Sequence, residues 1–231
     1  MAISRRALLK RIGAAGTAAV VPVPVVRRPP AAAAGDAQGS TPAANAVRRE
    51  AYETLTAAES DTLDAMTARI IPTDASGPGA EEARAAHYID RALGGALASS
   101  RAAYAAGLAA LDAYARAKTG APFAQLAASD QDAILLDLDG NTATGFTPNA
   151  RAFLNLVRAH TIEGTFSDPY YGGNANFVGW DLIGYPGVRV SSTPAEQQLN
   201  TVITPNHKSA YDFPMFSKSS GAKTGDSHDG H

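Results

Sequence analysis

The chain has 231 residues, of which 45% are hydrophobic and 18% are charged, and its formal net charge at pH 7 is −2. These proportions are typical of a globular protein and show no basic excess of the kind that indicates nucleic-acid binding. The sequence contains no cysteine. This excludes disulfide bonds, iron–sulfur clusters held by thiolates and covalently attached c-type haem in this chain.

Residues 1–34 have the features of a twin-arginine signal peptide. Arg5 and Arg6 are followed by Ala-Leu-Leu-Lys, then by a weakly apolar stretch over residues 12–26 and by small residues that offer a cleavage site. The alternative is an uncleaved membrane anchor, but the apolar stretch is short for a bilayer and is interrupted by glycines and prolines. We therefore expect the twin-arginine translocase to export the chain to the periplasm.

This export route carries proteins that have already folded, often because they must acquire a cofactor or a partner before export. Since the sequence shows no evident cofactor ligands, we expect the leader to export a partner together with this chain. Residues 35–50 are predicted to be a linker of small residues, and residues 51–214 a folded domain. Residues 215–231 are polar and rich in glycine, which predicts a disordered tail.

Helical patterns cover much of the domain. The first begins at a capping box formed by Thr56 and Glu59, and it ends before Pro72. Glu81 and Glu82 favour the start of a second helix, because negative charge is stabilised at a helix N-terminus. The apolar stripes of these two helices are Leu63, Met66 and Ile70, and then Ala86, Ile89, Leu93 and Leu97.

Three further helices are predicted. One begins near Ser100 and ends at Gly120, the next is capped by Ser129, and the last has Thr147 as its N-cap and closes at Gly164. Their inward residues are Tyr104, Leu108, Leu111 and Ala115; Ile134, Leu135 and Leu138; and Phe153, Leu154, Val157 and Thr161. No alternating strand pattern is convincing. The sequence therefore predicts an all-α fold, a compact helical domain with a long ordered loop region near its C-terminus.

That loop region follows from residues 160–187, HTIEGTFSDPYYGGNANFVGWDLIGYPG, which mix glycines with aromatic residues and contain the only tryptophan. Each glycine inside a helix costs about 1 kcal/mol relative to alanine, so a long regular helix is excluded here. The aromatic content argues equally against a disordered linker. Long ordered loops of this kind are usually functional.

The aromatic residues of this segment have two compatible uses. Some can form a small satellite core that holds the loop, and others can form a surface that faces another protein, since tyrosine and tryptophan are enriched at binding hot spots. The predicted interface residues are Phe166, Tyr170, Tyr171, Asn174, Phe177, Trp180 and Tyr185.

His160, Glu163 and Asp168 are the candidates for chemistry. His160 and Glu163 share a helical face, and the three side chains together could bind a metal or act as acid and base. The alternative is structural, with His160 near a helix C-terminus and Glu163 fixing a turn. One histidine with scattered carboxylates falls short of a typical metal shell, so we expect no catalytic, cofactor or metal site in this chain.

The words IEGTFSDPYYGGN and FVGWDLIGYPG resemble the signature of the gluconate 2-dehydrogenase subunit 3 family. A second block supports the resemblance: residues 69–74 (RIIPTD), residues 77–80 (GPGA) and residues 87–90 (HYID). The resemblance covers about residues 55–189. Members of this family are small subunits of membrane-bound periplasmic flavin dehydrogenases that act on CH–OH donors.

The resemblance implies two partners. One is a large FAD-containing catalytic subunit of the glucose–methanol–choline (GMC) type, which would oxidise a sugar, polyol or sugar acid. The other is a multihaem cytochrome c subunit that passes electrons to the membrane. The small subunit would have no redox role, would help its flavin partner mature and leave the cell, and would lie at the inner membrane through its partners. The alternative from a different class is a stand-alone periplasmic sugar-binding protein or metal-dependent enzyme that uses His160, Glu163 and Asp168.

Overall fold

The computed structural model describes residues 51–216. The predicted signal peptide with Arg5 and Arg6, the predicted linker and nearly all of the predicted tail lie outside the described residues. Contacts divide the chain into residues 1–51 and residues 52–231, and every described helix belongs to the second unit.

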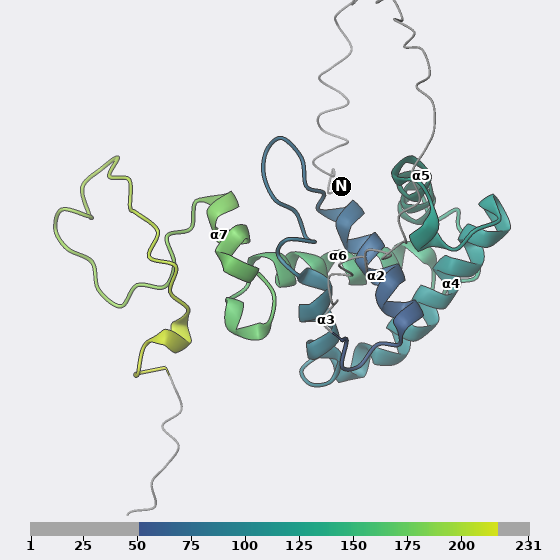
Figure 1. Cartoon of the computed structure of the whole chain (residues 1–231), viewed down its shortest axis with the longest axis horizontal. Helices are drawn as coiled ribbons and strands as arrows, with labels where there is room; N and C mark the ends of the chain where they lie inside the picture. Colours follow the sequence, from purple (N-terminus) through teal and green to yellow (C-terminus); the bar gives the residue numbers. More distant parts are fainter. Residues whose placement is uncertain (1–50, 217–231) are drawn as a thin grey trace, which may run out of the picture. The chain divides into compact units, whose positions relative to one another are not determined.

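The described residues are helical, which confirms the all-α prediction (Figure 1). The α-helices are α2 (Ala57–Ile70), α3 (Ala85–Leu93), α4 (Arg101–Thr119), α5 (Ala128–Asp139), α6 (Ala150–Phe166) and α7 (Val178–Ile183). Short 3₁₀ turns are η1 (Ala98–Ser100), η2 (Phe123–Gln125), η3 (Pro169–Tyr171), η4 (Ala175–Phe177) and η5 (Ala210–Asp212). Within residues 51–216 the only β pairing recorded is an isolated bridge between Asp74 and Gly77. None of the helices in this range is long and apolar enough to cross a membrane.

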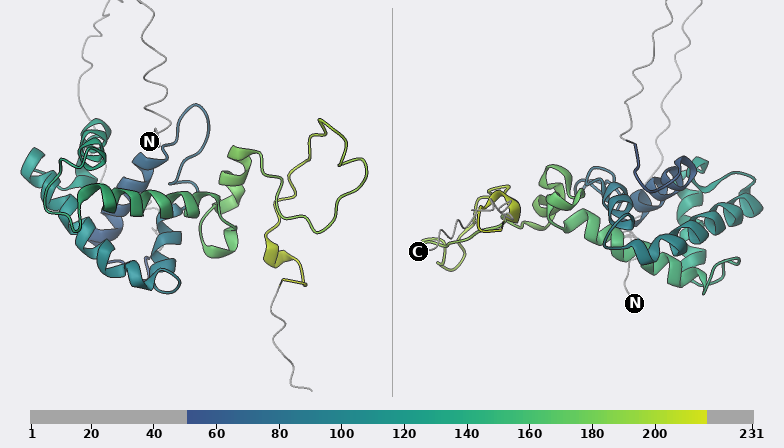
Figure 2. Two further views of the ribbon diagram at one scale, coloured as in Figure 1. Left: turned by 180° about the vertical axis from the view of Figure 1, so that it is seen from behind. Right: turned by 90° about the horizontal axis from the view of Figure 1, so that it is seen from below.

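One hydrophobic core joins helices α2 to α6, which lie together in both views of Figure 2. The predicted apolar stripes supply most of it. Its most deeply buried large side chains are Leu63, Met66, Ile89, Tyr104, Leu108, Leu111, Phe123, Ile134, Leu138 and Val157. The periodicity of the sequence therefore identified the inward face of each long helix correctly.

Two helix ends are where the sequence placed them. Thr56 and Glu59 form the capping box of α2, with each side chain bonded to the other residue's backbone N–H. Gly120 ends α4 in the left-handed region, at a φ of 86°, as expected for a glycine C-cap.

Four other helix boundaries were predicted wrongly. Helix α3 begins at Ala85, because Glu82 turns its carboxylate back to Thr73 Oγ1 and the Gly79 N–H in the preceding loop. Ala127 precedes α5, so Ser129 lies within that helix. Asn149 caps α6 through the Ala152 N–H, and α6 continues past Gly164 to Phe166, because Gly164 packs closely against the backbone of Ala85.

A buried carboxylate holds the start of the domain in place. Asp90 of α3 is only 2% exposed, and it accepts backbone N–H bonds from three consecutive residues that precede α2. The donor–acceptor distances are 2.6 Å for Glu53, 2.9 Å for Thr54 and 2.8 Å for Leu55. The segment before α2 is thus fixed to α3 by one side chain.

Replacing this carboxylate should destabilise the whole domain. We expect Asp90→Ala to lower the free energy of unfolding by about 3 kcal/mol, because three N–H donors lose a charged acceptor. The measurement is denaturant unfolding at neutral pH. Glu53→Ala removes an exposed carboxylate from the same contact without removing the acceptor, and it should change stability by less than about 0.5 kcal/mol. Equal effects of the two variants would contradict this role of Asp90.

Candidate functional site

The chain after α6 folds back over the C-terminal end of that helix. Residues 167–187, called the cap segment here, contain η3, η4 and α7 and make contacts with α6 and α3. The last carbonyl groups of any helix lack partners within the helix and must find them elsewhere. The cap segment supplies these partners to α6.

Asn174 is the central residue of this cap. Its side chain is fully buried, and its backbone lies in the left-handed region at a φ of 44°, which asparagine tolerates better than most residues. The Asn174 backbone N–H donates to the carbonyl of Gly164 at 2.7 Å, and its amide Nδ2 donates to the carbonyl of Ser167 at 2.8 Å. Its Oδ1 accepts from the Gly179 N–H at 2.8 Å, which ties the start of α7 to the end of α6.

Trp180 completes the cap from α7. The ring is 4% exposed, and its Nε1–H donates to the carbonyl of Phe166, the last residue of α6, at 2.9 Å. Phe177 lies beside it with the ring centroids 5.4 Å apart, and Tyr185 meets it edge-on at 4.8 Å. The rings therefore form a small satellite core around the end of α6.

Two glycines allow this close approach. A Cβ atom on Gly173 would lie 2.1 Å from the carbonyl oxygen of Gly164, and one on Gly179 would lie 1.8 Å from that of Thr165. No side chain fits at either position without moving the backbone. Gly173 and Gly179 thus allow the dense packing of the cap against α6.

The outer side of the cap presents tyrosine rings. Tyr170 is 56% exposed and Tyr171 is 47% exposed, and both stand on the short turn η3. Tyr211 joins them from the C-terminal part of the chain: its ring stacks on Tyr170 with centroids 3.7 Å apart, and its hydroxyl lies 2.9 Å from that of Tyr171. Tyr170, Tyr171 and Tyr211 are called the tyrosine face below.

The predicted interface residues thus divide into two layers. Asn174 and Trp180 lie inside and hold the cap together, while Phe166 and Phe177 are partly buried. Tyr170, Tyr171 and Tyr185 are exposed, Tyr185 by 39%. Of the predicted interface residues, these three tyrosines offer the most surface for contact with another molecule.

The three candidates for chemistry each have a separate partner. His160 is buried, and its Nδ1 lies 2.9 Å from the Tyr104 hydroxyl, against which the imidazole also stacks. Glu163 accepts from the Tyr88 hydroxyl at 3.2 Å. Asp168 caps η3 through the Tyr170 N–H and also accepts from Ser209 Oγ at 2.6 Å and from the Ala210 N–H at 2.8 Å. Within residues 51–216, no group of three His, Asp or Glu side chains is arranged to hold a metal ion.

Burial affects the proton affinities of this region. It lowers the pKa of His160 below the ordinary 6.5, and the nearby Glu163 carboxylate opposes this only in part. Burial, reinforced by the Glu163 carboxylate, raises the pKa of Tyr88 to about 12. At neutral pH these conditions favour a neutral imidazole and protonated phenols, as suits a packed structural cluster.

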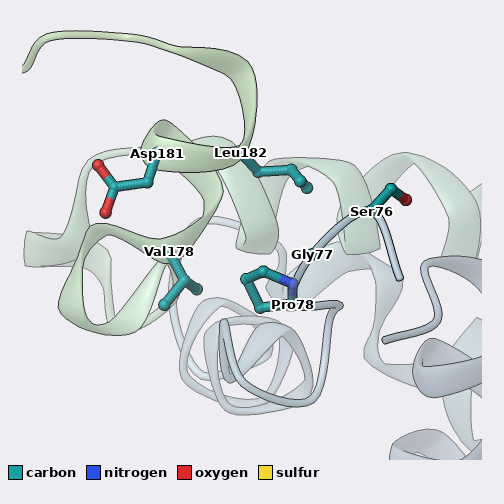
Figure 3. Close-up of a pocket in the computed structure, with 6 residues that line it drawn as sticks. All are labelled: Ser76, Gly77, Pro78, Val178, Asp181 and Leu182. Atoms are coloured by element: carbon teal, nitrogen blue, oxygen red, sulfur yellow. The ribbon is translucent and has the colours of Figure 1, made fainter. Parts of the chain in front are cut away.

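A shallow hollow of about 390 Å³ lies between the loop before α3 and α7. Figure 3 shows Val178 and Leu182 directed toward Gly77 and Pro78, while the Asp181 carboxylate points away from them. That carboxylate is paired with His207 Nε2 at 2.8 Å. The hollow is lined by polar and apolar groups in similar measure, and it does not bring a set of catalytic groups together.

Sequence reasoning did not find the contribution of residues 206–212 to the cap. His207 stacks on Phe177, and Ser209 and Tyr211 contact Asp168 and the two exposed tyrosines. The local signal is present, because Ser209 and Asp212 form a capping box. Ser209 is bonded to Asp168, which lies 41 residues earlier in the chain. Nothing in the spacing of the sequence indicates that the two segments pack together.

A helical scaffold with a rigid cap and exposed tyrosines has the features of a protein-binding module. The chain matches the family model of gluconate 2-dehydrogenase subunit 3 over residues 57–187, more than half of its length, and it belongs to that family. The matched region runs from the start of α2 to the end of the cap segment. No curated protein matches the chain, and no solved structure does. The family consists of subunits of gluconate 2-dehydrogenase-like oxidoreductase complexes, and the resemblance noted from the sequence is confirmed.

Replacing Asn174 should loosen the cap. We expect Asn174→Ala to lower the free energy of unfolding by about 3 kcal/mol, because two buried groups lose their partners and alanine disfavours the left-handed region. Asn176 is the matched control: it has a φ of 54° but is exposed, so Asn176→Ala should cost only about 1 kcal/mol. Thermal or denaturant unfolding of both variants measures the difference. If the two variants lose the same stability, the side-chain bonds of Asn174 do not hold the cap.

His160 should make stability depend on pH. Because its pKa is lower in the folded protein than in the unfolded chain, the unfolded chain binds the proton first as the pH falls below about 6.5. We therefore expect the free energy of unfolding to decrease between pH 7 and pH 5, and to decrease less in His160→Gln. Tyr104→Phe removes the hydrogen bond but keeps the imidazole buried, so it should retain the dependence. An unchanged pH profile in His160→Gln would contradict this assignment.

Proposed function

We propose that this chain is a non-catalytic accessory subunit of a periplasmic flavin dehydrogenase complex. In this proposal its partner is a GMC-type FAD-containing catalytic subunit, which contacts the cap segment at Tyr170, Tyr171 and Tyr185. The observation that carries the proposal is the exposure of these tyrosines on a cap that is otherwise densely packed. Tyrosines bury much area with few rotatable bonds, so rings held in this way are suited to a stable protein contact.

The chemistry is assigned to the partner subunits. His160, Glu163 and Asp168 are engaged in bonds that hold α6, α3, α4 and the C-terminal turn together. FAD in the catalytic subunit would accept electrons from a CH–OH donor, and haem c in a cytochrome subunit would pass them to the membrane. The support for these cofactors is the family membership, together with the absence of cysteine from this sequence.

The role in maturation and export follows from the predicted leader. We propose that the twin-arginine signal of this chain exports the bound catalytic subunit as well, which then reaches the periplasmic side of the inner membrane. The rigid cap is consistent with this, because a partner that is carried in the folded state requires an interface that is complete before export. The cytochrome subunit would hold the complex at the membrane.

A pull-down from native periplasm and membranes tests the proposal. The chain, tagged at its C-terminus, should recover a large protein with flavin absorbance, and haem absorbance should accompany it if the cytochrome subunit is bound. The double variant Tyr170→Ala/Tyr171→Ala should bind that flavoprotein at least about tenfold more weakly, since truncated hot-spot tyrosines each cost about 2 kcal/mol or more.

The control is Leu136→Ala/Ile162→Ala, which removes two side chains that are similarly exposed, 68% and 47%, on α5 and α6. It should recover as much flavin as the wild-type chain. A colourless protein that elutes alone would contradict the subunit role and favour a stand-alone periplasmic binding protein. Flavin recovery that is unaffected by the tyrosine variant would contradict the location of the interface.

A further inference from the structure

The matched family region ends at residue 187, but the described chain continues with an ordered element. Residues 188–213 are called the C-terminal arm here. Figures 1 and 2 show it as a long loop beyond α7, away from helices α2 to α5. The arm contributes no residue to the hydrophobic core, so core packing does not explain why it is ordered.

The arm is closed at its base. The Val188 N–H donates to the carbonyl of Lys208 at 3.0 Å, and the Asn206 N–H donates to the carbonyl of Pro186 at 2.9 Å. The Asn206 amide Nδ2 also donates to the carbonyl of Val188 at 2.9 Å. These bonds join the two chain segments at the base, so residues 189–205 form a loop whose ends are fixed next to each other.

The base is also fixed to the cap segment. His207 pairs with Asp181 and stacks on Phe177 with ring centroids 5.0 Å apart. Beyond it, Ser209 and Ala210 donate to Asp168. The loop is therefore held in a set position relative to the tyrosine face, to which the arm itself contributes Tyr211.

The loop exposes most of its large apolar side chains, Ile203 alone being half-buried. Leu199 is 94% exposed, Val202 is 92% exposed and Val190 is 48% exposed, and no apolar residue between 188 and 206 is buried. Arg189 and Glu196 pair with each other, so the loop carries no net charge of its own. A loop that is fixed at its base and exposes neutral apolar side chains is suited to an apolar surface on another protein.

The area exposed by the tyrosines of the cap segment is small for a complete protein interface. Tyr170, Tyr171 and Tyr185 together expose on the order of 300 Å², given the size of a tyrosine side chain. A stable interface buries about 800 Å² on each partner. A subunit that docks through the exposed tyrosines must therefore bury further surface of this chain. The C-terminal arm adjoins these tyrosines, because its Tyr211 stacks on Tyr170.

We propose that the C-terminal arm is a second docking element, whose residues Leu199 and Val202 insert into an apolar surface of the same catalytic subunit that contacts the exposed tyrosines. This inference rests on the proposed function, since it names a further part of the same interface. It also predicts that the catalytic partner of this chain carries an apolar groove beside its tyrosine contact. Residues 57–187, which match the family, would then supply only part of the affinity for the catalytic subunit.

The test uses the full-length tagged chain with Leu199→Gln/Val202→Gln. Both side chains are more than nine-tenths exposed, so the variant should keep the wild-type melting temperature. In the native pull-down, it should bind the flavoprotein at least about tenfold more weakly, measured as flavin retained per chain after washing. Leu136→Gln/Ile162→Gln, the matched control on α5 and α6, should retain flavin as the wild type does. An untagged copy of the chain, present in the same sample, reports self-association.

The outcomes separate this inference from the proposed function. If the wild-type chain recovers no flavoprotein, the proposed function and the docking role both fail. If the wild type and the arm variant retain the same flavin, the arm does not dock and the subunit role stands. If the arm variant loses the untagged copy while it keeps flavin, the arm binds a second copy of this chain and the inference is overturned.

Discussion

The capping of the α6 C-terminus is the interaction on which the rest of the site depends. Helix α6 ends with carbonyl groups that need partners, and Asn174 and Trp180 supply them from the following segment. The backbone of that segment can approach only because Gly173 and Gly179 have no side chains. Once the cap is formed, η3 is held in place and directs Tyr170 and Tyr171 outward. The surface proposed for partner binding is therefore a consequence of how one helix ends.

The same constraint explains why the buried and the exposed rings are adjacent. Trp180 donates to the last carbonyl of α6, so its ring is buried under the cap. Phe177 and Tyr185 pack against this ring. Asp168 caps the turn that bears the tyrosines and at the same time fixes the C-terminal arm. A subunit built in this way presents a preformed surface, which lowers the ordering cost of binding a partner. Such a surface suits the proposed role, in which the chain binds its partner before export.

Much of the fold could be predicted from the sequence, because local chemistry determines it. The capping box at Thr56, the C-cap at Gly120 and the apolar stripes of the long helices each depend on residues a few positions apart. The wrongly predicted helix boundaries lie where a segment distant in the sequence determines the local structure. Glu82 turns back to the preceding loop, and Gly164 remains helical because Ala85 of α3 packs against it. For the site, composition predicted an ordered aromatic segment, but it could not assign Asn174 and Trp180 to the inner layer or place Tyr211 on Tyr170.

In the proposed complex, the cap segment is the contact surface for a flavin-containing catalytic subunit. The most direct measurement is an electron cryomicroscopy structure of the complex that this chain forms in the native periplasm and membranes. We predict a flavoprotein that covers Tyr170 and Tyr171, with the helices α2 to α6 unchanged beneath the cap. A complex in which both tyrosines remain exposed to solvent while the flavoprotein binds another face of the domain would contradict this interface.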